Sequence, residues 1–164
     1  MINYQDIRKR ADGRHKYLAV LGDTELTDSD ESSYVCADKH GGMQILFWDI
    51  THSTDGKTSD QDYFFQRHPA REKGNAIVKL KNLSPGSYRL ATCQIGFGQN
   101  DSHSRYLELG QSSDLNRTAI GELKSLSSGK PVSETTVTVD ANGEFETTLP
   151  LHEDDVCFLS LTPE

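Results

Sequence analysis

The sequence lacks a long apolar run, a secretion signal and an excess of positive charge. In 164 residues, no segment approaches the ~20 consecutive apolar residues of a membrane-spanning helix, so we expect no membrane association. Residues 1–6 contain no apolar signal-peptide core, and the chain as written is expected in the cytoplasm. A formal net charge of −8 disfavours nucleic acid as a partner but is compatible with a neutral ligand such as a sugar.

The three cysteines, Cys36, Cys93 and Cys157, are widely separated, and each lies in an apolar run. An odd number without C-x-x-C spacing argues against a disulfide framework and against a zinc site. We therefore expect buried free thiols that behave as small hydrophobic side chains. The six histidines contain no H-x-x-x-H or H-x-H pair, which again gives no basis for zinc.

The patterns that would indicate catalysis are also missing. The sequence contains no G-x-S-x-G motif for a serine nucleophile. Acidic clusters at 23–31 and 153–155 lie in polar stretches, whereas an acid/base pair needs burial to separate its pKa values, so these clusters are expected to be solvated turns. Neither residues 28–30 nor 55–62 match EF-hand spacing, although calcium at the 55–62 loop stays open. We expect no catalytic residue, no metal and no cofactor.

What the sequence does contain is a set of short apolar runs with polar turns between them. Residues 3–21 have three- and four-residue apolar spacing, which predicts a helix that ends at Gly22 in a left-handed conformation. Apolar spacing over 115–126 predicts a second helix, with an N-cap among residues 112–114. A shorter apolar patch, 106–109, ends at Gly110.

The remaining apolar runs alternate as strands do. Turns at 39–42 and 140–143 predict hairpins, and Ser84-Pro85-Gly86 predicts a further turn. The pattern favours one mostly β domain, an antiparallel β-sandwich with an N-terminal helix and one or two short inserted helices. The predicted strands are 34–37, 43–50, one from residue 63, 76–83, 88–97, 136–139, 145–149 and 155–161.

Six short motifs stand out, at residues 21–26, 44–49, 83–88, 100–101, 106–110 and 149–151. In their order and spacing they resemble the segment that follows the catalytic barrel in family 39 glycoside hydrolases, the β-xylosidase family. The resemblance extends from about Lys16 to Leu161. It implies a β-sandwich attached to a (β/α)₈ barrel that carries two catalytic glutamates, one of them after an asparagine.

This chain departs from that family pattern because it contains no Asn-Glu pair and no alternating βα pattern. A barrel of this type needs about 200 residues or more, which leaves no room for one here. We therefore expect residues 1–22 to be a connector helix and 23–164 an accessory sandwich that supports or docks a barrel. Alone it should not be an enzyme. An independent carbohydrate-binding module for xylan-type sugars is the alternative.

Two sets of residues are candidates for contacts. The apolar stripe Tyr4, Ile7, Ala11 and Leu18 would face a barrel or another partner. Trp48, Tyr63 and Phe64 would stack on a sugar such as a xylo-oligosaccharide, although the apolar run around Trp48 favours core packing. In the family, part of the sandwich precedes the barrel, so an unpaired edge could also support self-association.

Overall fold

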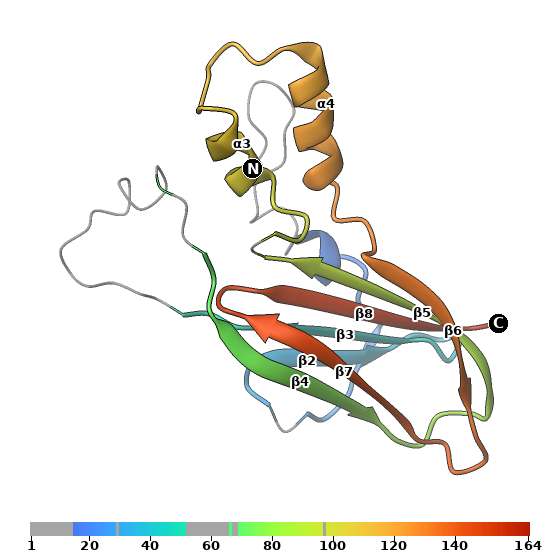
Figure 1. Cartoon of the computed structure of the whole chain (residues 1–164). Coiled ribbons are helices and arrows are strands. Elements are labelled where there is room, and N and C mark those ends of the chain that lie inside the picture. The colour runs from blue at the N-terminus through green and yellow to red at the C-terminus, as the bar shows by residue number, and fades with distance from the viewer. Residues whose placement is uncertain (1–14, 29, 52–65, 67–68, 97) are drawn as a thin grey trace.

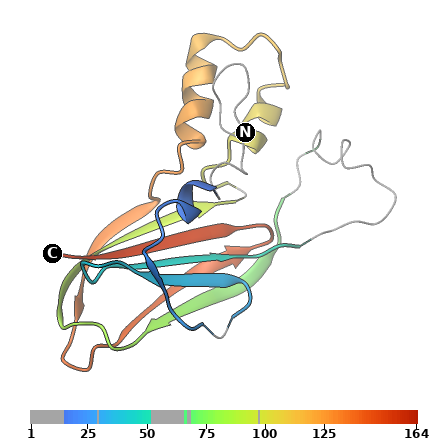
Figure 2. The same ribbon diagram turned by 180° about the vertical axis from the view of Figure 1, so that it is seen from behind.

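Two antiparallel β-sheets face each other, and a pair of helices extends away from one end of them (Figures 1 and 2). The computed structural model describes residues 15–28, 30–51, 66, 69–96 and 98–164. The larger sheet has six strands in the order β1 (Thr24–Glu25), β2 (Ser33–Ala37), β3 (Met43–Trp48), β8 (Val156–Pro163), β5 (Gly86–Ile95) and β6 (Ser133–Val139). The smaller sheet pairs β4 (Glu72–Leu80) with β7 (Phe145–His152). The predicted antiparallel sandwich is confirmed.

The β2–β3 hairpin forms where the sequence predicts it. Ala37 pairs with Met43, and Gly41 adopts a φ of 81°, which suits a residue without a Cβ. The strand ends at Trp48, two residues earlier than predicted, although the Asp49 amide still bonds to the carbonyl of Asp155 at 2.9 Å, next to the Trp48–Val156 pair.

Strand β8 lies at the centre of the larger sheet, between β3 and β5. Its residues from Val156 to Leu159 are all buried, because both faces of this strand are covered. A strand buried on both faces is expected to be continuously apolar rather than alternating. The run Val156-Cys157-Phe158-Leu159 has that composition.

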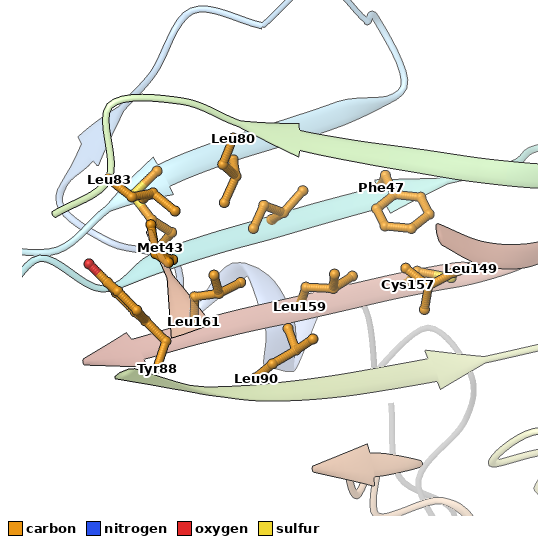
Figure 3. Close-up of a cluster of buried hydrophobic side chains, with 12 residues drawn as sticks. Met43, Phe47, Leu80, Leu83, Tyr88, Leu90, Leu149, Cys157, Leu159 and Leu161 are labelled. Atoms are coloured by element: carbon orange, nitrogen blue, oxygen red, sulfur yellow. The ribbon is translucent and has the colours of Figure 1, made fainter. Parts of the chain in front are cut away.

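The main core fills the space between the two sheets (Figure 3). Strand β5 directs Tyr88 and Leu90 into it, while Cys93 and Ile95 lie in a second cluster on the opposite face, as the predicted alternation requires. The buried members of the main core are Met43, Ile45, Phe47, Leu80, Leu83, Tyr88, Leu90, Val139, Leu149, Cys157, Leu159 and Leu161.

The turn at 140–143 is not a hairpin, contrary to the sequence prediction. It connects β6 to β7, which lie in different sheets, since β6 pairs with β5 and β7 pairs with β4. Gly143 has a φ of 67°, and a Cβ placed on it would lie 2.6 Å from the Leu83 carbonyl oxygen. Turn chemistry alone therefore predicted a reversal of the chain but not the change of sheet.

The inserted helices are α3 (Ser102–Glu108) and α4 (Arg117–Leu126). The Asn116 side chain caps α4 by accepting from the Ala119 amide at 2.9 Å, so the N-cap predicted among residues 112–114 was wrong. Across the helix pair, Arg105 contacts Glu122 at 2.7 Å. No helix in the described ranges is long and apolar enough to cross a membrane.

Of the predicted N-terminal helix, the structure describes residues 15–21, and among these residues 15–18 are helical; residues 3–14 lie outside the described ranges. This helix ends before residue 21, and Gly22 is not in the left-handed region. Glycine is needed there for another reason, because a Cβ on Gly22 would lie 2.3 Å from the Ala37 carbonyl oxygen. The strand predicted from residue 63 also begins outside the described residues.

Candidate docking face and aromatic pair

The larger sheet carries a second apolar cluster on the face that points away from β4 and β7. Tyr17, Leu46, Cys93, Ile95, Val156 and Phe158 form its buried part, with Leu21 and Trp48 packed against it. A sheet that is apolar on both faces needs a cover on both. Among the described members, only Tyr17 and Leu21 come from outside the sheet, so the segment 15–22 supplies their cover. We call this segment the strap.

The strap is attached through Tyr17, whose ring stacks on Phe158 with centroids 5.0 Å apart and planes 4° from parallel. Burial raises the pKa of the Tyr17 phenol far above its usual range, and the neighbouring Cys93 raises it further. The hydroxyl therefore stays neutral. The hydroxyl approaches the Gly129 carbonyl at 3.5 Å. Tyr17 is therefore a core residue, although its position in the predicted helix did not mark it as one.

Several apolar side chains stay exposed in the strap, in β2 and just after β3. Leu18 and Val20 expose 45% and 50% of their surface, and Tyr34 and Ile50 expose 43% and 48%. Leu18 is the one member of the predicted contact stripe that lies within the described residues. Tyr4, Ile7 and Ala11 lie outside them, so the stripe as a whole stays a prediction.

Trp48 and Tyr34 form an aromatic pair beside the second cluster. Their ring centroids are 5.4 Å apart and their planes are inclined by 45°. Trp48 is half-buried at the edge of the cluster rather than inside the main core. Tyr34 was not a sequence candidate, because its face of the sheet becomes known only from its pairing with Leu46. The predicted sugar contacts Tyr63 and Phe64 lie outside the described residues.

An open hollow of about 410 Å³ lies next to Tyr34. Its polar lining includes Glu25, Asp28 and Asp30. Asp28 accepts from the Asp30 amide at 3.1 Å and from the Ser33 hydroxyl, so this acidic run forms its own turn. Within the described ranges, no group of three or more metal-ligating side chains comes together. The solvated-turn interpretation of residues 23–31 agrees with this geometry.

The second acidic run contains a buried carboxylate that the sequence interpretation missed. Asp155 exposes only 1% of its surface and accepts from the Gln94 side-chain amide at 2.8 Å and from the His152 amide at 2.8 Å. A Cβ on Gly96 would overlap its oxygen. Asp155 therefore holds the β7–β8 turn against β5, and the prediction of a solvated turn was wrong for this residue.

Asp49 fixes the other side of the same turn. Burial alone would raise its pKa, but bonds from the Thr51 hydroxyl at 2.7 Å and the Asp154 amide at 3.2 Å, with Lys73 nearby, hold that pKa below its usual value. The Lys73 ammonium lies 3.6 Å from the Asp49 carboxylate. These contacts join the end of β3 to β4 and to the β7–β8 turn.

The whole chain matches solved structures of glycoside hydrolases. It superimposes on the family 39 enzyme from Xanthomonas axonopodis pv. citri with a TM-score of 0.94 and 26% identity, over 99% of this chain and 32% of that chain. A monomeric β-xylosidase from Caulobacter crescentus matches with a TM-score of 0.91 and 27% identity, again over 99% and 32%. No family model and no curated protein matches the sequence.

A more distant structure, a bacterial orthologue of human α-L-iduronidase, matches with a TM-score of 0.70 at 14% identity and supports the fold alone. The fold and the two family 39 matches define the class, an antiparallel β-sandwich of the kind found in family 39 glycoside hydrolases. The resemblance drawn from the sequence motifs is thereby confirmed. The chain spans about a third of the length of the enzymes it matches.

Proposed function

We propose that this chain is an accessory β-sandwich whose strap-covered face docks a (β/α)₈ catalytic barrel. The observation that carries the proposal is the second apolar cluster, because it lies on the outer face of the larger sheet. The matched family 39 enzymes have about two further thirds of their length beyond the aligned region, enough for such a barrel. We carry over no catalytic glutamate to this chain, so we expect its contribution to be structural.

Exposed apolar side chains in the strap and in β2 also favour docking of the barrel on this face. Leu18 and Val20 come from the strap, and Tyr34 comes from β2 beside it. Contiguous apolar surface on a soluble domain commonly marks a contact with another domain. A barrel placed here would remove these side chains from water and make the strap part of the interface.

The test joins this chain to the barrel of the Caulobacter crescentus β-xylosidase, in place of the third that it matches. We expect one cooperative melting transition and hydrolysis of a chromogenic xyloside, with no turnover by the chain alone. Leu18→Glu with Val20→Glu should split the melting into two transitions. Ile77→Glu, on the exposed side of β4, is the control. Two independent transitions in the unmodified fusion would contradict docking.

Carbohydrate binding is a second candidate function, which the Tyr34–Trp48 pair favours. A sugar could stack on the exposed Tyr34 ring while its hydroxyls reach the carboxylates of the adjacent hollow. Calorimetric titration with xylohexaose tests this. Tyr34→Ala should weaken binding about tenfold or more, whereas Tyr34→Phe keeps the ring and most of the affinity. No measurable binding by the unmodified chain would remove this candidate.

Self-association through a strand edge is a partner proposal of its own, and β6 is the edge that favours it. Among the described strands, β6 pairs only with β5 and carries neither lysine nor proline. Strand β4, by contrast, has Lys73, Lys79 and an irregular register at Gly74, which protect an edge. Sedimentation should detect a dimer that Thr136→Lys abolishes, and a monomer at high concentration would contradict it.

A further inference from the structure

We infer that Lys16 and Tyr17 form a fixed joint, which ties the strap both to β8 and to the C-terminal end of α4. The joint is a property of this chain alone. It rests on the proposed function only in that the preceding chain would lead to the barrel. The joint would then help to fix the orientation of the barrel relative to the sandwich.

The first half of the joint is Tyr17 on the sheet. Its ring is 1% exposed and lies flat against Phe158 in the central strand β8. Stacked aromatic pairs stabilise by about 0.5–1.5 kcal/mol beyond their area burial. Because β8 lies between β3 and β5, Tyr17 is anchored to a central strand of the larger sheet. Its position cannot change without opening the second cluster.

The second half of the joint is Lys16 on α4. Its ammonium donates to the carbonyl oxygens of Ser128 and Gly129, each at 3.0 Å. These carbonyls directly follow Ser127, the residue that caps α4. The end of a helix has unsatisfied carbonyls and a partial negative charge, so a cation is stabilising there. Lys16 therefore binds the two residues that follow α4, close to the negative end of the helix, from a segment more than a hundred residues away.

Gly129 makes the close approach of these two segments possible. It has a φ of 61°, and a Cβ placed on it would lie 3.1 Å from the Tyr17 hydroxyl. At the other end of the strap, Gly22 lies against the Ala37 carbonyl. The strap is thus fixed at both ends, one contact set being at residues 16–17 and the other at residue 22.

Such a segment differs from a hinge, which has few buried contacts and opens at low free-energy cost. Here the strap and the α4 end share two charge-assisted hydrogen bonds, which are stronger than neutral ones. Loosening one segment should therefore loosen the other. The strap and the C-terminal end of α4 should consequently respond together when either contact is lost.

Hydrogen exchange on the full chain tests the joint. The amides to follow are Ala19 and Val20 in the strap, bonded to His15 and Tyr17 carbonyls, and Ser127 at the end of α4, bonded to the Leu123 carbonyl. Lys16→Met keeps the aliphatic stem but removes both donors. We expect faster exchange, by about tenfold or more, in the strap and in residues 125–129 together.

Two controls separate this result from a general loss of stability. Lys16→Arg keeps a cation and should keep most of the protection. Lys130→Met removes an exposed lysine close to the same helix end and should leave exchange unchanged. Unchanged exchange in Lys16→Met, or a change in the strap with none in residues 125–129, would overturn the joint. Both outcomes are read without any barrel, so they do not depend on the docking experiment.

Discussion

The side-chain amide of Gln44 donates a hydrogen bond to the Asp38 carboxylate at 3.0 Å, across the turn that joins β2 to β3. The same carboxylate accepts from the backbone amides of His40 at 2.8 Å and Gly42 at 3.0 Å. The Gly42 amide first, and then the His40 amide, hold the pKa of Asp38 below its usual value. The turn is therefore closed by an ionised side chain.

Asp38→Asn should destabilise the chain in a pH-dependent way. The folded state lowers the pKa of Asp38, so its contribution is fully present above the ordinary carboxyl pKa of about 3.9 and is lost as pH falls through the lower folded value. Thermal unfolding should show the largest difference from the unmodified chain near neutral pH. Asp114→Asn is the control, and an equal difference in strong acid would contradict the assignment.

Gly22→Ala should destabilise the chain and Gly121→Ala should not. A Cβ at residue 22 would press on the Ala37 backbone, which cannot move without breaking the β1–β2 pairing, and overpacking of this kind costs about 1–3 kcal/mol. Gly121 lies inside α4 with open space around it, where alanine should gain about 0.5–1 kcal/mol. Urea unfolding compares both variants, and equal effects would contradict the close contact at Gly22.

The three thiols should not react in the folded chain. Cys36, Cys93 and Cys157 are free and buried, as the sequence predicted. Burial raises the pKa of each thiol, that of Cys157 to about 12, so the reactive thiolate is scarce at pH 8. Titration with a disulfide reagent should give three thiols in denaturant and almost none without it. Rapid reaction under native conditions would show that the sheet opens locally.

Leu159→Ala should cost about 2–5 kcal/mol of unfolding free energy. Leu159 is fully buried on β8, in the main core between the two sheets. The matched change Ile77→Ala removes a similar side chain that is 58% exposed on β4, and its effect should stay within about 0.5 kcal/mol. Denaturant midpoints give both values. A small loss for Leu159→Ala would mean that the two sheets are not packed as described.

The alternation of strand residues carried most of the fold prediction. In β5 it separated Tyr88 and Leu90 from Cys93 and Ile95 correctly, because the side-chain period of a strand is local. The change of sheet at residues 140–143 could not be predicted in the same way. A turn sequence encodes only the local backbone path. The pairing partner of β6 is β5, more than forty residues earlier, and the partner of β7 is β4, about seventy residues earlier.

The candidate site was less accessible from the sequence. Trp48 was a candidate for its residue type, but its neighbour Tyr34 emerged only from strand pairing. Asp155 resembled its exposed neighbours because burial of a carboxylate depends on distant partners, here Gln94. The contacts of Lys16 and Tyr17 with the end of α4 could likewise not be predicted from the sequence, since the two segments are more than a hundred residues apart.

The central place of β8 has a consequence for how the chain reaches its structure. Strand β8 comes last in chain order, yet it separates β3 from β5, so the earlier strands can form two half-sheets but cannot join them. Pairings between distant segments form slowly because the loop must close first. During synthesis, the edges of β3 and β5 that pair with β8 would therefore stay unpaired until β8 emerges from the ribosome. That interval is when the chain is most exposed to misassembly.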